Sequence, residues 1–163
     1  DEEGYYRIGD AGFVVDEQRP ERGVIFNGRV AEDFKLSSGT WVSVGTLRVE
    51  LVSRLAPWVQ DIVIAGHDRD ELGLLVFATP AGAAAPETLA QALRRVMHEQ
   101  RDAGAGSSKT PGCALVLTDP PDAEAGEITD KGYVNQRAVL ARRADAVRRL
   151  FASKDASVIR WNS

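Results

Sequence analysis

The sequence of 163 residues is poor in the residue types that build cross-links and metal centres. It contains one cysteine, Cys113, and two histidines, His67 and His98. A single cysteine excludes an intramolecular disulfide and a zinc site with several thiolate ligands. His67 lies beside the acidic side chains of Asp68, Asp70 and Glu71, but such a cluster is more typical of a solvated turn. We therefore expect no metal site.

Long hydrophobic runs and basic character are also missing. The longest apolar run, residues 72–79, is far too short to span a bilayer. The net charge of -4 argues against binding to nucleic acid or to an anionic membrane. The chain opens on three acidic residues without a leader pattern, and its first ten residues already resemble folded sequence. We expect a cytoplasmic fragment with no membrane span and no nucleic-acid partner.

What is present is a strong hydrophobic pattern, with 44% hydrophobic residues and 27% charged residues. Apolar side chains at helical spacing predict helices over 44–55, from 86 onward and over 135–152. β-branched runs predict three strands of one sheet over 59–65, 72–78 and 113–117. We expect Cys113 to be a core residue and the four arginines of the last helix to form a solvated face: Arg142, Arg143, Arg148 and Arg149.

The amino-terminal third is richer in turns. Residues 34–36 and 40–42 flank a glycine-bearing turn and predict a β-hairpin. Short strands predicted within 5–15 and over 24–26 have few local partners. The fold class is therefore α+β: a β-hairpin and a three-stranded sheet flanked by helices over 28–153, preceded by the strand-rich end of a larger domain over 1–27 and followed by a tail over 154–163.

Two polar segments near the amino terminus are candidates for ligand binding. Residues 6–10 (YRIGD) place Asp10 after a glycine, where a carboxylate can accept two hydrogen bonds from a ribose diol; an ordinary β-turn with a surface aspartate is the alternative. Residues 28–35 (GRVAEDFK) carry Arg29, a planar fork suited to phosphate or ribose oxygens. A strand edge protected by charge is the alternative there.

A third segment, residues 126–133 (GEITDKGY), holds Lys131 in a glycine-flanked loop just ahead of a predicted helix. A lysine there is a compact cation on a long flexible stem, able to reach a phosphate. A solvent-facing lysine without a function is the alternative.

In order and spacing, the three segments resemble the carboxyl-terminal part of the adenylate-forming superfamily of acyl-CoA synthetases, adenylation domains and luciferases. Residues 6–10 are similar to its Tyr-Arg-Thr-Gly-Asp motif. Residues 28–35, followed by 38–43 (SGTWVS), are similar to its hinge and glycine-loop hairpin, and Lys131 matches its late catalytic lysine. Within the superfamily the wording of residues 28–36, 66–73 and 128–133 most resembles feruloyl-CoA synthase.

The resemblance implies a lid domain that rotates between two half-reactions, adenylation of a carboxylic acid by ATP and transfer of the acyl group to coenzyme A. It implies Lys131 as the catalytic residue and Asp10 and Arg29 as ribose or phosphate contacts. Lys35, Gly39 and Trp41 would belong to the hairpin that lines the coenzyme A tunnel. The hinge would lie at Ala31, Glu32 or Asp33.

The same resemblance implies partners that this chain does not contain. The acid would be ferulate or a related aromatic acid, and ATP, AMP and Mg²⁺ would be held mainly by a large amino-terminal domain. The fragment alone would then be inactive. Two alternatives stay open: a non-catalytic binding or regulatory module with the same fold, and a ligase that loads the phosphopantetheine arm of a carrier protein.

Overall fold

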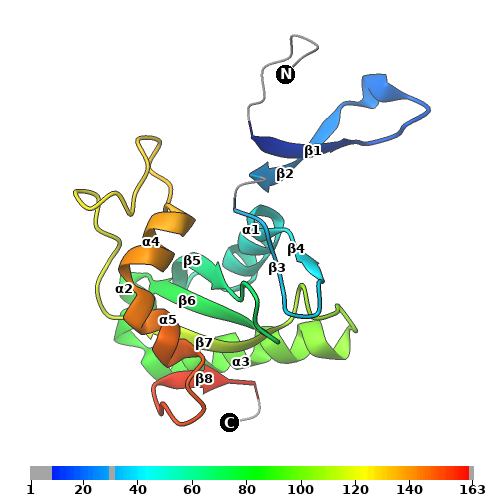
Figure 1. The fold of residues 1–163 in the computed structure, drawn as a ribbon. Helices are drawn as coiled ribbons and strands as arrows, with labels where there is room; N and C mark the ends of the chain where they lie inside the picture. Colours follow the sequence, from blue (N-terminus) through cyan, green and yellow to red (C-terminus); the bar gives the residue numbers. More distant parts are fainter. Residues whose placement is uncertain (1–8, 30–31, 162–163) are drawn as a thin grey trace.

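A computed structural model describes residues 9–29 and 32–161, which form a mixture of strands and helices (Figure 1). The strands are β1 (Asp10–Val14), β2 (Val24–Arg29), β3 (Phe34–Lys35), β4 (Trp41–Val42), β5 (Val59–Ala65), β6 (Leu72–Ala78), β7 (Pro111–Leu117) and β8 (Val158–Arg160). The helices are the 3-10 helix η1 (Pro20–Arg22), α1 (Val44–Arg54), α2 (Pro80–Ala84), α3 (Pro86–Asp102), α4 (Gln136–Arg142) and α5 (Ala144–Leu150). The predicted α+β class is confirmed.

The central sheet has the strand order β5-β6-β7-β8. Its outer pairs are antiparallel, whereas β6 and β7 are parallel. A parallel pair needs a crossover connection, which α2 and α3 supply. The prediction of three strands was one short: β8 lies within the residues predicted as a tail and pairs with β7 through Leu115 and Val158. Three residues are too few to give a period-2 signal in the sequence.

Alternate side chains of the sheet contribute to two separate cores, one on each face. Ile62 and Ile64 of β5 pack into the core that α1 and α3 cover. Val63 and Ala65, one residue along, pack into the core that α4 and α5 cover. Because successive strand side chains point to opposite faces, a sheet covered on both sides needs near-continuous apolar strands. This requirement explains the uninterrupted runs of the sequence.

The predicted helix over 135–152 is two helices with a break at Arg143. The backbone of Arg143, at φ -99° and ψ 36°, lies outside the helical region. The apolar stripe continues through the break, from Val139 to Leu150, and both residues are fully buried. Periodicity therefore indicated one helix, whereas the break turns Arg143 out of the predicted solvated face.

The amino-terminal strands form a hairpin that stands out from the body of the sheet (Figure 1). β1 pairs antiparallel with β2, so that the Cα of Asp10 lies opposite Arg29. Of the two strands predicted within 5–15, the structure describes one, and residues 5–8 lie outside the described part. Apolar side chains on this hairpin are exposed to solvent, including Phe13 at 53% and Val24 at 69%.

The short helix α2, which the sequence analysis did not predict, packs closely on the chain that precedes β5. The hydroxyl of Thr79 accepts a hydrogen bond from the Gly82 amide at 3.1 Å and caps the helix. A Cβ added at Gly82 would stand 2.1 Å from the carbonyl oxygen of Trp58. Only glycine permits this approach of two backbones.

We therefore expect Gly82→Ala to destabilise the domain, because a backbone carbonyl cannot move aside as a side chain can. The expected loss is about 1–3 kcal/mol in the free energy of unfolding, measured by urea denaturation. Ala83→Ser, on an exposed position of the same helix, is the matched control. An unchanged unfolding midpoint in Gly82→Ala would contradict the close approach.

Candidate functional site

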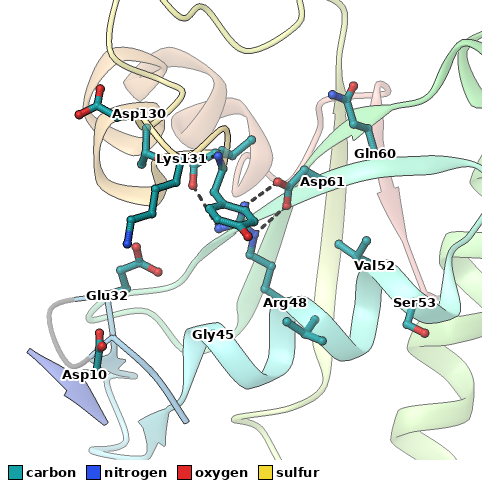
Figure 2. A pocket seen from close by; sticks show the side chains of 14 residues that line it. Asp10, Glu32, Gly45, Arg48, Val52, Ser53, Gln60, Asp61, Asp130 and Lys131 are labelled. Atoms are coloured by element: carbon teal, nitrogen blue, oxygen red, sulfur yellow. Dashed lines mark hydrogen bonds and ion pairs between the residues drawn. The ribbon is translucent and has the colours of Figure 1, made fainter. Parts of the chain in front are cut away.

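A pocket of about 900 Å³ lies between α1, β5 and the loop that carries Lys131 (Figure 2). Asp10, Glu32 and Lys131, from three distant segments of the sequence, all line it. These are three of the residues that the sequence analysis selected, so the structure brings them to one cavity. The pocket is lined by Asp10, Glu32, Gly45, Arg48, Val49, Val52, Ser53, Gln60, Asp61, Thr129, Asp130, Lys131, Tyr133 and Val134.

Lys131 stands at the tip of a tight turn. The amide of Thr129 donates to the carbonyl of Tyr133 at 2.8 Å, and the amide of Gly132 donates to the carbonyl of Thr129 at 2.8 Å. Gly132 has φ +81°, a left-handed conformation that favours glycine. Lys131 is exposed and points toward Glu32, whereas the carboxylate of Asp130 points away (Figure 2). The turn thus presents a cation to the pocket.

Arg48, which was not among the residues selected from the sequence, holds the chain just after this turn. The guanidinium of Arg48 forms a two-pronged ion pair with Asp61, at 2.7 Å and 2.5 Å, and donates to the carbonyl of Val134 at 3.2 Å. It therefore joins α1, β5 and the lysine loop at the wall of the pocket. The sequence held one signal for this pair: Asp61 is the only charge in the apolar run 59–65.

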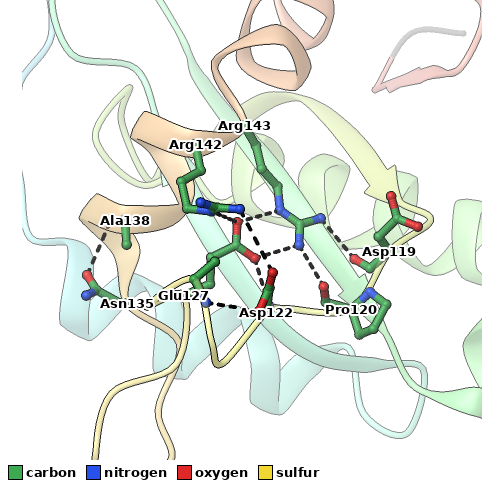
Figure 3. Close-up of polar contacts among 9 residues, drawn as sticks. Asp119, Pro120, Asp122, Glu127, Asn135, Ala138, Arg142 and Arg143 are labelled. Atoms are coloured by element: carbon green, nitrogen blue, oxygen red, sulfur yellow. Dashed lines mark hydrogen bonds and ion pairs between the residues drawn. The ribbon is translucent and has the colours of Figure 1, made fainter.

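The chain just before this turn is held by a buried ion pair between Arg143 and Glu127 (Figure 3). Arg143 donates to Glu127 through Nε at 2.9 Å and through Nη2 at 2.6 Å. Glu127 is only 1% exposed. Its hydrogen bonds with Arg143 hold the pKa of the Glu127 carboxyl below its ordinary value of 4.5, against the opposing effect of burial. The prediction that Arg143 lies on a solvated face was therefore wrong, because its fork finds a buried carboxylate.

Gln136 completes the attachment of the loop to the sheet. Its side-chain amide accepts from the Ile64 amide at 3.0 Å and donates to the Ile64 carbonyl at 2.6 Å. Ile64 belongs to β5, an edge strand with one side unpaired by any neighbour in the described sheet. Gln136 supplies there the two hydrogen bonds that a further strand would make.

The predicted hairpin residues Lys35, Gly39 and Trp41 lie away from the pocket, on β3–β4. Gly39 has φ +80° and makes the turn. The ammonium of Lys35 lies 5.9 Å from the ring centroid of Trp41, and Trp41 is 51% exposed. The structure thus separates the selected residues into two groups, one in the pocket and one on the hairpin.

The β3–β4 hairpin is tied to the turn that joins β5 and β6. The Ser37 amide donates to the carbonyl of Arg69 at 2.9 Å, and the Asp68 amide donates to the carbonyl of Lys35 at 3.1 Å. The Ser37 hydroxyl donates to Asp70 at 2.5 Å. The hairpin is a two-stranded sheet of its own, and these hydrogen bonds attach it to the body of the domain.

The predicted hinge residues divide into two kinds. Asp33 accepts a hydrogen bond from the amide of Val44 at 2.9 Å, at the start of α1, and so is fixed to the domain. Glu32 lines the pocket. Ala31 lies outside the described residues. Arg29 is placed as the last residue of β2, and its side chain is outside the description.

Two further observations concern metals and membranes. Among residues 9–29 and 32–161, no group of three or more His, Cys, Asp and Glu side chains is arranged to hold a metal ion. Within the same ranges, no helix combines the length and the apolar character needed to cross a membrane.

Comparison with known proteins gives a family match over most of the chain. Residues 35–155 match the family described as the AMP-binding enzyme C-terminal domain. The chain is 31% identical, over 93% of its length, to a carboxylic acid reductase of Segniliparus rugosus, and 23% identical, also over 93%, to the chloroplastic long-chain-fatty-acid–[acyl-carrier-protein] ligase AEE15 of Arabidopsis thaliana. It spans only 13% and 22% of the lengths of these curated relatives.

Comparison with solved structures gives matches of the same kind. The A domain of the carboxylic acid reductase from Segniliparus rugosus, in complex with AMP and a co-purified carboxylic acid, matches 93% of this chain with a TM-score of 0.74 and 26% identity; the match covers 24% of that domain. The adenylation domain of a carboxylate reductase from Mycobacterium chelonae matches 94% of this chain with a TM-score of 0.75, and the match covers 24% of its length. At 23% identity the latter likeness concerns the fold alone.

The buried pair of the loop predicts a pH-dependent stability. A carboxyl whose pKa is lowered by folding stabilises the folded state above its ordinary pKa, and this contribution is lost as the pH falls through the lowered value. We therefore expect Glu127→Gln to be less stable than the wild type by about 3 kcal/mol at pH 7, with the difference shrinking as the pH falls below 4.5.

The measurement is the free energy of unfolding by urea across that pH range. Glu124→Gln, on an exposed position of the same loop, is the control and should follow the wild type throughout. A difference that stays constant down to the acid limit would contradict the charged state of Glu127.

Proposed function

Because the chain belongs to the family of AMP-binding enzyme C-terminal domains, we propose that it is the mobile lid of an adenylate-forming ligase. Such an enzyme joins a carboxylic acid to a thiol through an acyl-adenylate. Residues 1–27 would be the end of the large domain that binds ATP and the acid, and residues 28–153 would be the lid, with the hinge segment at its start. The exposed apolar side chains of β1 and β2 support this division, because a surface of that kind normally packs against protein.

The observation that carries the proposal is the shared pocket. It brings together a carboxylate, Asp10, that can accept hydrogen bonds from a ribose diol and a cation, Lys131, that can face a phosphate. Asp10 would hold the nucleotide's sugar, with Arg29 as its neighbour across the β1–β2 pair. Lys131 would stabilise negative charge on the α-phosphate oxygens as the acid attacks. Retention of all three residues favours a catalytic lid over a non-catalytic module with the same fold.

The proposed motion follows from the attachment points. Asp33 is bonded to α1, so it would move with the lid, and the pivot would lie just before it, at Ala31 and Glu32. A rotation there would withdraw Lys131 from the nucleotide and bring the β3–β4 hairpin toward it. Trp41, half exposed on that hairpin, and Gly39 would then line the path of the incoming thiol. Lys35, beside the ring, would offer a cation to an anionic carrier of that thiol.

Two acceptors of the acyl group remain candidates. The motif wording that resembles feruloyl-CoA synthase favours ferulate or a related aromatic acid and coenzyme A. The curated relatives favour a second candidate, transfer to the phosphopantetheine arm of a carrier protein, because one of them is named as an acyl-carrier-protein ligase. Both share the adenylation step, ATP as the nucleotide substrate, and Mg²⁺ held by the large domain.

The test of the proposal is the whole enzyme that carries this chain, with Lys131→Ala. We expect pyrophosphate release from acid and ATP to fall by about 100–1,000-fold, because one stabilising donor is lost in the transition state. Thioester formation from a supplied acyl-adenylate should be unchanged. Lys109→Ala, at an exposed lysine of another loop, is the control. Equal loss of both half-reactions would contradict the lid assignment.

Asp10 has a separate signature. We expect Asp10→Ala to raise the KM for ATP while leaving the KM for the acid unchanged, because the carboxylate would contact only the nucleotide. Steady-state kinetics at varied ATP would measure this. An unchanged ATP dependence would remove Asp10 from the nucleotide site.

The acceptor is decided by product analysis. The enzyme is supplied with ATP and either ferulate or a long-chain fatty acid, together with coenzyme A or a phosphopantetheinylated carrier protein. If the leading candidate holds, thioester forms with coenzyme A and ferulate. Thioester that forms only on the carrier protein would establish the second candidate.

A further inference from the structure

The loop that carries Lys131 is long and has little regular structure of its own. It runs from the end of β7 to the start of α4, over residues 118–135, and its one β-bridge joins Ile128 to Val134. An ammonium on such a loop can serve one reaction step only if the base of the loop is held in place.

Arg143 contacts the loop at three places. Its Nη1 donates to the carbonyl of Asp119 at 2.9 Å, and its Nη2 donates to the carbonyl of Pro120 at 2.7 Å, both near the start of the loop. Its Nε and Nη2 both donate to the carboxylate of Glu127, in the middle of the loop, as Figure 3 shows. The break between α4 and α5 lies at this residue and turns the guanidinium inward.

Glu127 in turn binds both ends of the loop. Its carboxylate accepts from the amide of Asp122 at 2.9 Å, and its backbone carbonyl accepts from the amide of Asn135 at 2.8 Å. Glu127 is buried, and the side chain of Arg143 is only 16% exposed. A fork of charge-assisted hydrogen bonds in such surroundings fixes geometry as well as charge.

We propose that Arg143 and Glu127 are positioning residues for Lys131: their buried ion pair clamps the base of the loop and sets where the ammonium stands in the pocket. This inference rests on the proposed function of Lys131. Neither residue lines the pocket, so neither would touch the nucleotide. Their effect would pass through the backbone of the loop to the turn at 129–133.

The neighbouring Arg142 offers a matched control. It is 51% exposed, and its nearest contacts with Glu127 and Asp122 are looser, at 3.7 Å and 3.9 Å. Arg142→Met removes the same charge from the adjacent residue, which makes only these looser contacts. A general effect of positive charge on this helix would appear in both variants, whereas a clamp would appear in Arg143 alone.

In the whole enzyme we expect Arg143→Met to slow adenylation on the order of 100-fold, as displacement of a catalytic group by about 1 Å does. Transfer from a supplied acyl-adenylate should stay at the wild-type rate, as should both half-reactions of Arg142→Met. Arg143→Lys, which keeps the charge but loses the fork, should recover only part of the loss. Equal slowing of both half-reactions in Arg143→Met would overturn the proposal.

Hydrogen exchange in this chain separates a loosened loop from an unfolded domain. In Arg143→Met, exchange should speed up over residues 118–135 and stay unchanged over β5 and β6. If Arg143→Met does not fold, Glu127→Gln, which keeps the shape of the side chain, takes its place in both measurements. Unchanged exchange in the loop, or faster exchange throughout the sheet, would overturn the clamp.

A double variant separates this inference from the proposed function. Adenylation by Lys131→Ala/Arg143→Met should be no slower than by Lys131→Ala alone, because a clamp has nothing left to position; multiplied losses would overturn the clamp. If Lys131→Ala itself leaves adenylation intact, the proposed function fails. If it abolishes adenylation while Arg143→Met does not, only the positioning role fails.

Discussion

β5, β6 and β7 carry apolar side chains on both faces, and in β6 every residue from Leu72 to Phe77 is buried. A sheet of this kind must be covered on both sides, which places α1 and α3 on one face and α4 and α5 on the other. To reach the second face, the chain leaves the end of β7 and crosses to α4. The loop over 118–135 is that crossing, and Lys131 stands on it.

Elements whose hydrophobic pattern is set by residues close together along the chain could be predicted from the sequence. The stripe of α3, with Leu89 and Met97, and the apolar runs of the sheet are signals within a few turns or residues. The break at Arg143 could not be predicted, because its cause lies in carbonyls more than twenty residues away, at Asp119 and Pro120. β8 and α2 are too short for periodicity to register.

The candidate site divides in the same way. Asp10 and Lys131 could be selected because glycine-flanked polar segments in a given order resemble a known family, and the structure places both on one pocket. Arg48 lies in none of the selected segments, and Glu127 lies in the segment 126–133 without being selected as a candidate itself. Their importance arises only when partners from separate elements meet, as Arg48 does with Asp61 and with Val134.

The hydrogen bonds between Gln136 and Ile64 have a consequence for solubility. An unpaired strand edge is a template on which another chain can add a strand. The proposed lid motion would expose such an edge repeatedly. At the edge of β5 the Gln136 amide occupies the polar groups of Ile64, and the charged Asp61 lies three residues away on the same strand. Together they protect this edge against intermolecular strand addition and aggregation.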